Sequence, residues 1–243
     1  MKEKAVFNWS GGKDSAFALY KIIQQKEYDE ITLLTSISEQ YQRISMHGVR
    51  VDLLDRQAQS MALPLVKVEI PEMPSMEVYE KVMAKTLTDL KTKGVTTSIF
   101  GDIFLEDLRK YREDKLAGLN IKAVFPLWKI PTKNIIKEFI DLGFKTITTC
   151  VNEKYLDKSF AGRIMDADFL NDLPANVDPC GENGEFHTFV FEGPVFKNPI
   201  NFKKGEVVYR KYSAPKENEN SEYNCNSDAP IDYGFWYCDL VVV

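Results

Sequence analysis

The sequence predicts an α/β protein in which a parallel, doubly wound sheet is followed by a smaller α+β domain. Three observations support this fold class. Short apolar runs alternate with amphipathic, helix-like segments in the first half of the chain, as in a parallel sheet covered on both faces. A turn with two adjacent glycines joins the first apolar run to the first helical segment. Turns and short strands replace this alternation later, so we predict two domains, 1–122 and 123–243.

The elements of the first domain are predicted from their apolar periodicity. Buried strands are expected at 5–7, 31–35, 65–68 and 96–100. Amphipathic helices are expected at 14–25, 49–61 and 76–91. The last helix should place four apolar residues near one face, namely Val78, Val82, Leu87 and Leu90.

The second domain is predicted to begin with a helix that Thr132 caps and Gly143 ends. A further helix is expected at 156–170, although Gly162 lowers its helix propensity. Strands are expected at 145–151, 187–191, 207–212 and 235–242. The segment 215–230 is rich in Asn, Glu and Ser and is predicted to be a loop.

Composition limits the class of protein. The 243 residues are 44% hydrophobic and 28% charged, as expected of a globular protein with its own core. A net charge of -5 disfavours a general nucleic-acid or anionic-membrane surface. No apolar run is long enough to cross a membrane, and the four cysteines form no close pair, so neither a zinc knuckle nor a redox motif is indicated. We expect a cytoplasmic protein with reduced thiols.

The glycine-rich turn has the features of a phosphate-binding site. It consists of Ser10, Gly11, Gly12, Lys13, Asp14 and Ser15. The glycines let the backbone approach a phosphate, and the first N–H groups of the helix lack intrahelical partners. The helix dipole adds partial positive charge, and the serine hydroxyls add hydrogen-bond donors. Lys13 adds a positive charge unless its side chain points to solvent. Asp14 is expected to assist a cation, to cap the helix, or both. The glycine spacing excludes a Walker A motif.

Other polar residues should meet this turn at the carboxyl edge of the sheet, where open α/β sheets bind ligands. Thr35 ends the second predicted strand and begins the segment that leaves it through Ser36, and Gly101 and Asp102 follow the fourth strand. Asp102 is a candidate for a metal or ribose contact, with a loop cap as the alternative. His47 is either a nucleotide-side contact or a structural residue.

The second polar cluster is the segment 178–188, Asp-Pro-Cys-Gly-Glu-Asn-Gly-Glu-Phe-His-Thr. Glu182 and Glu185 stand three residues apart and are followed by His187, one of only two histidines. Two carboxylates near a substrate hold a cation, hold an amine or act as a base, and His187 either orients a carboxylate or acts as the base itself. A metal site and a plain polar turn before a strand are the alternatives.

The motifs in their order resemble a known family. The segment 10–15 resembles the Ser-Gly-Gly-x-Asp-Ser signature of the PP-loop ATP pyrophosphatases, which have a Rossmann-like (HUP) sheet. The motifs that follow are Gly101-Asp102-Ile103, Pro126-Leu127-Trp128, Gly181-Glu182-x-Gly184-Glu185-x-His187-Thr188 and Glu192-Gly193-Pro194-Val195-Phe196. Together they resemble the diphthine–ammonia ligase family from about residue 4 to residue 200. The chain departs from archaeal members after His47, where it reads Gly48-Val49-Arg50, and its end beyond about 205 has no recognised counterpart.

The resemblance implies an ATP-dependent amidation, the last step of diphthamide synthesis on elongation factor 2. ATP would adenylate the acceptor carboxylate with release of pyrophosphate, and ammonia would then displace AMP. The residues carried over for catalysis are Asp14, Glu182, Glu185 and His187. Those expected at the nucleotide are Ser10, Gly11, Gly12, Lys13, Asp14, Ser15, Thr35, Ser36, His47, Gly101 and Asp102. Mg²⁺ is expected to bridge the phosphates, with Asp14 as its ligand.

The acceptor and the alternatives complete the prediction. A trimethylammonium group on the acceptor would suit an acidic pocket with a ring from Phe186, Trp128 or Trp236.

A tRNA-thiolating PP-loop enzyme shares the adenylation step but usually has paired cysteines, so Cys150 and Cys180 would have to meet in space. A nucleotide-binding module without turnover would use the same sheet. The expected partners are ATP, ammonia and a carboxylate acceptor, with a homodimer left open and no membrane or nucleic acid.

Overall fold

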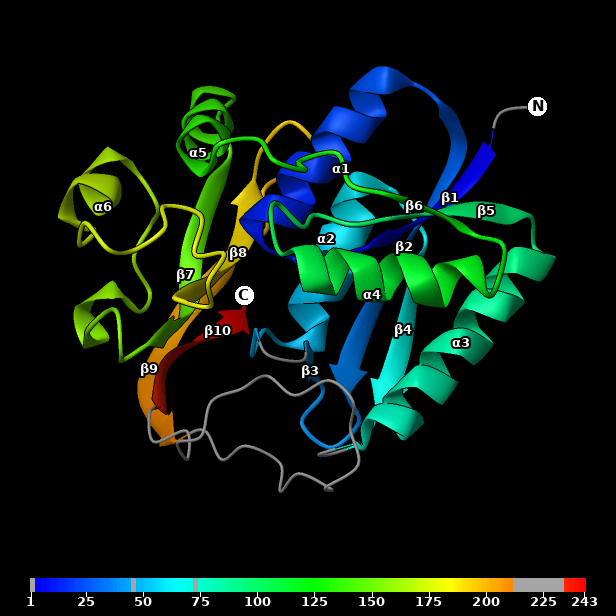
Figure 1. Ribbon diagram of the computed structural model, residues 1–243. Coiled ribbons are helices and arrows are strands. Elements are labelled where there is room, and N and C mark those ends of the chain that lie inside the picture. Colours follow the sequence, from blue (N-terminus) through cyan, green and yellow to red (C-terminus); the bar gives the residue numbers. More distant parts are fainter. Residues whose placement is uncertain (1–2, 45–46, 72–73, 212–233) are drawn as a thin grey trace.

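The computed structural model describes residues 3–44, 47–71, 74–211 and 234–243, and its larger sheet has six strands (Figure 1). The strands that run parallel are β1 (Glu3–Asn8), β2 (Tyr28–Ser38), β4 (Leu65–Ile70), β5 (Val95–Ile99) and β6 (Lys122–Val124). β1 pairs with β2 and β5, β4 pairs with β2, and β6 pairs with β5. The short β3 (Arg43–Ile44) runs antiparallel to β2.

Helices cover both faces of this sheet. They are α1 (Lys13–Gln25), α2 (Val51–Met61), α3 (Met76–Thr92) and α4 (Glu106–Ala117). Val6 of β1 shares a buried cluster with Leu87 of α3 and Leu116 of α4. The next residue, Phe7, points to the other face and shares a cluster with residues of α1 and α2, such as Leu19. The predicted α/β fold with a parallel, doubly wound sheet is confirmed.

The strand order places a ligand-binding edge at β1. From β1 the chain moves outward through β2 to β4 and then returns to the other side of β1 for β5 and β6. The order therefore reverses between β1 and β5, and open α/β sheets bind ligands at the carboxyl ends of the strands at such a point. The glycine-rich turn follows β1 directly, so it lies at this point.

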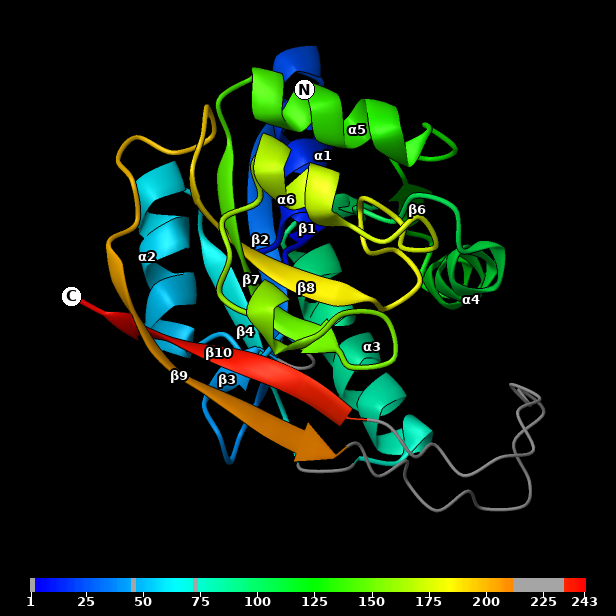
Figure 2. The same ribbon diagram turned by 90° about the vertical axis from the view of Figure 1, so that its left-hand side faces the viewer.

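The second half of the chain forms a separate antiparallel sheet with the order β8-β7-β10-β9. Its strands are β7 (Lys145–Asn152), β8 (Phe186–Glu192), β9 (Phe202–Lys211) and β10 (Gly234–Val242). Its helices are α5 (Thr132–Asp141) and α6 (Ala167–Asp172), with a 3₁₀ turn at Lys158–Phe160. Phe17 of α1 meets Phe139 of α5 edge to face at 6.4 Å, and one buried cluster runs through both halves. Figure 2 shows α1 close to β8 and α5.

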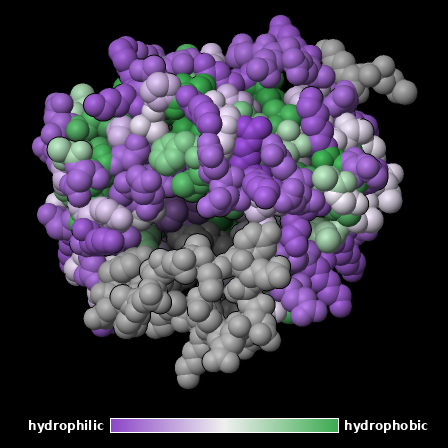
Figure 3. Space-filling view, viewed as in Figure 1, coloured by the Kyte–Doolittle hydropathy of each residue, from purple (hydrophilic) through white to green (hydrophobic). Residues whose placement is uncertain are grey.

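Apolar side chains outside the core are scattered. On the face drawn in Figure 3, hydrophobic side chains form small patches among hydrophilic ones. Within the described ranges, no helix is both long and apolar enough to cross a membrane.

Several predicted elements are wrong in detail. The helix expected at 156–170 is a 3₁₀ turn followed by the short α6, because Gly162 adopts a φ of +77° and the Asp166 side chain caps a new helix start. Thr132 is the first residue of α5, and Pro131 holds the cap position. Val78, one of the four apolar residues expected near one face of α3, is 40% exposed, whereas Leu87 and Leu90 are buried. α4 was not expected, because Leu116 is its only buried residue.

Two boundaries also differ. β2 continues to Ser38, so Thr35 and Ser36 lie within the strand rather than at its end. The division between residues 122 and 123 falls inside β6, which still belongs to the larger sheet. The predicted loop 215–230 lies outside the described residues.

Candidate active site

The segment 10–15, here called the cradle, is tightly packed at its glycines. Gly11 adopts a φ of +77°, which an L side chain rarely takes, and a Cβ on it would lie 2.9 Å from Gln57 Oε1. A Cβ on Gly12 would lie 3.1 Å from the Thr188 carbonyl oxygen. Gly101, which follows β5, packs against the start of α1. A Cβ added to it would lie 3.1 Å from the Ser15 nitrogen. The glycines are therefore needed for close backbone approach.

Two distant elements hold the cradle in place. The Val190 N–H of β8 donates to the Gly11 carbonyl at 2.9 Å, and the Lys13 N–H donates to Thr188 Oγ1 at 3.0 Å. The fully buried Gln57 of α2 donates to the carbonyls of Gly11 and Val190, at 3.0 and 2.6 Å. Gln57 was not identified from the sequence. Its position on the apolar face of α2 is the only sequence signal that could have indicated its role.

The polar side chains of the cradle are also fixed. The Ser10 and Ser15 hydroxyls are 3.1 Å apart, and Ser15 Oγ donates to the Gly12 carbonyl at 2.9 Å. Lys13 is 4% exposed and its Nζ lies 2.7 Å from Asp14 Oδ2. Burial, the largest single effect, lowers the pKa of Lys13, but the Asp14 carboxylate together with other nearby acidic groups raises it by more, so the pKa lies above the ordinary value and the ammonium stays charged.

Asp14 has the donor atom that a cation would need. Its Oδ1 is buried and has no hydrogen-bond partner among the described residues. Within the same ranges, no group of three or more His, Cys, Asp or Glu side chains forms a metal site. Mg²⁺ is commonly held by one or two carboxylates together with substrate phosphates, so Asp14 fits the predicted ion as part of such a set.

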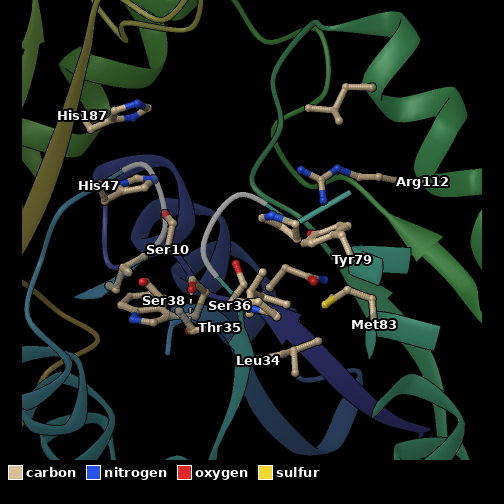
Figure 4. A pocket seen from close by; sticks show the side chains of 17 residues that line it. Ser10, Leu34, Thr35, Ser36, Ser38, His47, Tyr79, Met83, Arg112 and His187 are labelled. Atoms are coloured by element: carbon tan, nitrogen blue, oxygen red, sulfur yellow. Dashed lines mark hydrogen bonds between the residues drawn. The ribbon is translucent and has the colours of Figure 1, made fainter. Parts of the chain in front are cut away.

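Two cavities meet at the cradle. The larger, of about 680 Å³, has the size of a ligand pocket and includes Thr35, Ser36, His47 and residues of α3 (Figure 4). The smaller, of about 270 Å³, lies between the cradle and the segment 178–188.

Thr35 Oγ1 donates to the Trp9 carbonyl at 2.6 Å, so its side chain fixes the chain just before the cradle.

The two histidines meet in space although they are far apart in sequence. Their rings lie 4.4 Å apart, and both line both cavities. Figure 4 shows His47 and His187 together on one side of the larger cavity. Burial lowers the pKa of His187 to about 4 and that of His47 well below its ordinary value, so both rings are neutral at pH 7.

The two glutamates of the segment 178–188 have different surroundings. Glu182 lines the smaller cavity, and its Oε1 accepts the Ile103 N–H at 2.9 Å. Burial, and next the Asp14 carboxylate, raise the pKa of Glu182 to about 7. Glu185 is 1% exposed and accepts the backbone N–H groups of Asp178 and Asn183 at 3.0 and 2.8 Å. The structure thus places Glu185 outside the residues that line the cavity and uses its carboxylate to close the loop.

The remaining residues considered in the sequence analysis lie partly where they were expected and partly elsewhere. Asp102 is ion-paired with Arg112 of α4, a residue that sequence reasoning missed. Of the three candidate rings, Phe186 lines the smaller cavity. Trp128 and Trp236 line neither of the two cavities in the described part of the chain. Cys150 and Cys180 are both free thiols.

Comparison with known families decides which family this site belongs to. The diphthamide synthase N-terminal domain matches residues 1–119, and the diphthamide synthase C-terminal domain matches residues 131–218. This chain belongs to the diphthamide synthase family. The resemblance inferred from the motifs is confirmed, and the cradle and the segment 178–188 fall one in each of the matched family domains.

Named relatives agree with this assignment. The diphthine–ammonia ligase of Homo sapiens is 27% identical over 233 residues, covering 84% of this chain and 85% of its own. That of Bos taurus is 27% identical over 227 residues, covering 82% of each chain. That of Schizosaccharomyces pombe is 24% identical and covers 84% of this chain but 38% of its own. A solved U34-tRNA thiolase from Methanococcus maripaludis covers 58% of this chain at 19% identity, 57% of its own chain and a TM-score of 0.38, too distant to indicate function.

Proposed function

We propose that this chain is an ATP-dependent diphthine–ammonia ligase, which adenylates a carboxylate and converts it to an amide with ammonia. The family match and the relatives with that name support the reaction class. The observation that carries the proposal is the smaller cavity, where the glycine-rich cradle faces the carboxylate of Glu182. The cradle is suited to pyrophosphate, and Glu182 is suited to a proton transfer.

In the first step an acceptor carboxylate oxygen attacks the α-phosphorus of ATP. The bond from that phosphorus to the oxygen bridging to the β-phosphorus breaks, and pyrophosphate leaves. Donors of the cradle stabilise the charge that develops on pyrophosphate. Asp14 would hold Mg²⁺ through Oδ1, with Lys13 fixing the other carboxylate oxygen. When bound, Mg²⁺ supplies positive charge to the phosphate oxygens.

In the second step ammonia attacks the acyl carbon, the bond to the AMP oxygen breaks, and AMP leaves with both electrons. The nitrogen loses one proton to give the neutral amide. Ammonium is the main form at neutral pH, so a base must also take a proton to produce ammonia. Glu182, with its pKa of about 7, is matched to this task. His187, which is neutral beside the cavity, would orient the acceptor.

The acceptor proposed is diphthine, which the relatives carry in their names, and its carrier is taken from the family resemblance to be elongation factor 2. The alternative of tRNA thiolation is less well supported. Burial raises the pKa of the Cys150 thiol to about 12, whereas a reactive cysteine needs a lowered pKa. A binding module without turnover would not need the raised pKa of Glu182, which is a feature of proton-transfer sites.

The test is product analysis with ATP, ammonium and elongation factor 2 that carries diphthine. We expect AMP and pyrophosphate in equal amounts, together with replacement of one acceptor hydroxyl by an amino group in the mass spectrum. Asp14→Asn should lower the rate of AMP formation by about 10²-fold or more. Asp52→Asn, an exposed carboxylate at the start of α2, is the matched control and should leave it unchanged. Formation of AMP without a changed acceptor would overturn diphthine as the substrate, and no AMP would overturn the ligase.

A further inference from the structure

The two cavities share a small set of residues where they join. These residues are Asn8, Ser10, His47, Arg112 and His187. The proposed function puts the two terminal phosphates of ATP in the cradle, and the larger cavity next to it, of about 680 Å³, is the space left for the nucleoside. The α-phosphate of ATP then lies at the junction. Both histidines are neutral there, so Arg112 is the cation of the shared set.

The other cation of the smaller cavity is already engaged. Lys13 pairs with Asp14 at 2.7 Å, is 4% exposed and lies 5.5 Å from the centre of the Phe186 ring. Its contacts point toward the segment 178–188 rather than to the junction. A phosphate at the junction would therefore meet Arg112 as its positive partner.

Arg112 contacts two neighbours, Asp102 and Phe100. Its Nη2 donates to Asp102 Oδ1 at 3.1 Å, and its Nε lies 3.0 Å from Asp102 Oδ2. The guanidinium also lies 4.4 Å from the centre of the Phe100 ring. Its Nη1 makes no hydrogen bond to any described residue. Figure 4 shows the guanidinium extending from α4 into the larger cavity.

We propose that Arg112 binds the α-phosphate of ATP and that Asp102 is its positioning residue. The proposal rests on the proposed function. It names the residue that would allow an anionic acceptor carboxylate to react with an anionic phosphate. An acceptor carboxylate must approach a negatively charged phosphate, and a guanidinium at that point offsets their repulsion. This role differs from the metal or ribose contact expected for Asp102, because its carboxylate is ion-paired with Arg112 and its Oδ1 accepts a hydrogen bond from Arg112 Nη2.

Nucleotide binding tests the proposal without turnover. Calorimetry with AMP and with adenosine isolates the contribution of the α-phosphate, because the two ligands differ only there. Arg112→Met should weaken AMP about 10- to 100-fold and leave adenosine within about twofold. Arg109→Met is the matched control, since Arg109 lies on the same helix, pairs with Glu113 and lines neither cavity. It should change neither affinity.

Asp102→Asn tests the positioning role. It should reduce the preference for AMP over adenosine by less than Arg112→Met does, and Asp102→Glu should restore part of it. Thermal midpoints of all variants show whether each is folded. Equal loss of AMP and adenosine affinity in Arg112→Met, or no loss of either, would overturn the proposal. If the wild-type chain binds AMP but makes none from ATP, the proposed function fails while the assignment of Arg112 is still judged by the AMP preference.

Discussion

The cradle at 10–15 and the segment 178–188 face the same cavity but are built in different ways. The cradle follows β1 directly, and its glycines, serines and helix start act on the next few residues. The segment 178–188 is held mostly by its own carboxylates, because Asp178 accepts the N–H groups of Cys180 and Glu182, and Glu185 accepts those of Asp178 and Asn183. Distant groups then fix both regions, with Gln57 bonded to the cradle and the Ile103 N–H bonded to Glu182. The cradle is therefore recognisable from its own residues, whereas the role of each carboxylate in 178–188 depends on what it meets.

Glu182 and Glu185 show the consequence inside one segment. The sequence offers two equivalent carboxylates, and the fold makes one accessible to the cavity and the other a buried acceptor of loop N–H groups. Spacing alone does not distinguish them, because the difference comes from what each carboxylate meets. A residue's type thus suggests a role, and its neighbours decide it.

The largest expected effect separates these two glutamates. Glu182→Gln should lower the rate of amide formation about 10²- to 10⁴-fold, because the base is lost while an acceptor for the Ile103 N–H remains. ATP binding, measured by calorimetry, should stay within a few-fold. Glu185→Gln should instead destabilise the protein by about 1–3 kcal/mol in urea unfolding, because an amide cannot accept all three N–H donors. The opposite pattern would reverse the assignment of the two residues.

Two glycine-to-alanine variants distinguish the effect of crowding in the cradle from the effect of backbone strain. Gly11→Ala should weaken pyrophosphate binding about tenfold or more, since its methyl group would press on the fixed side chain of Gln57 in the cradle. Gly143→Ala is the control, because Gly143 has a similar φ of +79° but has no atom within 4 Å of the added Cβ. Both should lose about 1–2 kcal/mol of stability from the left-handed backbone, and only the first should lose pyrophosphate binding, measured by calorimetry. Equal binding by both variants would show that the cradle tolerates a side chain.

The pH dependence of the amidation step tests Glu182 in the intact protein. The carboxylate form acts as the base, so the rate should rise about tenfold per pH unit below pH 7 and level off above the pKa of about 7. Stability should change in the opposite direction. A folded-state pKa above the unfolded value of 4.5 favours folding at low pH, and this contribution is lost as the pH rises through about 7. Glu182→Gln should remove both dependences, and a wild-type rate that is flat between pH 5 and 8 would contradict the role.

The smallest effect concerns the link between the two sheets. Asp239 of β10 pairs with Arg43 at 2.8 Å and with Arg50 at 2.7 Å, on either side of the turn that carries His47. Burial alone would raise the pKa of Asp239, but hydrogen bonds from both arginines lower it to about 2. Asp239→Asn should cost about 1–2 kcal/mol near neutral pH, and the wild-type advantage should disappear as the pH falls from about 4 toward 2.

A surface pair provides the control for that measurement. Asp172 lies 2.8 Å from Arg163 but is 58% exposed, so Asp172→Asn should change stability by less than about 0.5 kcal/mol. If Asp239→Asn is equally mild, the ion pairs that Asp239 makes with Arg43 of β3 and with Arg50, the residue before α2, add little to stability.

Much of the fold was predictable because the signals are local. The apolar runs predicted β1, β2, β4 and β5, and Gly143 correctly marked the end of α5. Prediction failed where apolar periodicity is weak. α4 buries only Leu116, so its pattern did not stand out, and Arg112 was missed with it. The helix expected at 156–170 failed because apolar residues there pack from a 3₁₀ turn and loop instead.

The sequence by itself determined the parallel sheet, the cradle and the family. These follow from residues that act on their immediate neighbours: glycines that permit a close turn, and apolar side chains at strand or helix spacing. Only the tertiary structure decided which glutamate reaches the cavity, that the two histidine rings come within 4.4 Å of each other, and that Asp102 pairs with Arg112. Burial and charged partners set those roles, and both depend on segments that are distant in the chain and meet only when it folds.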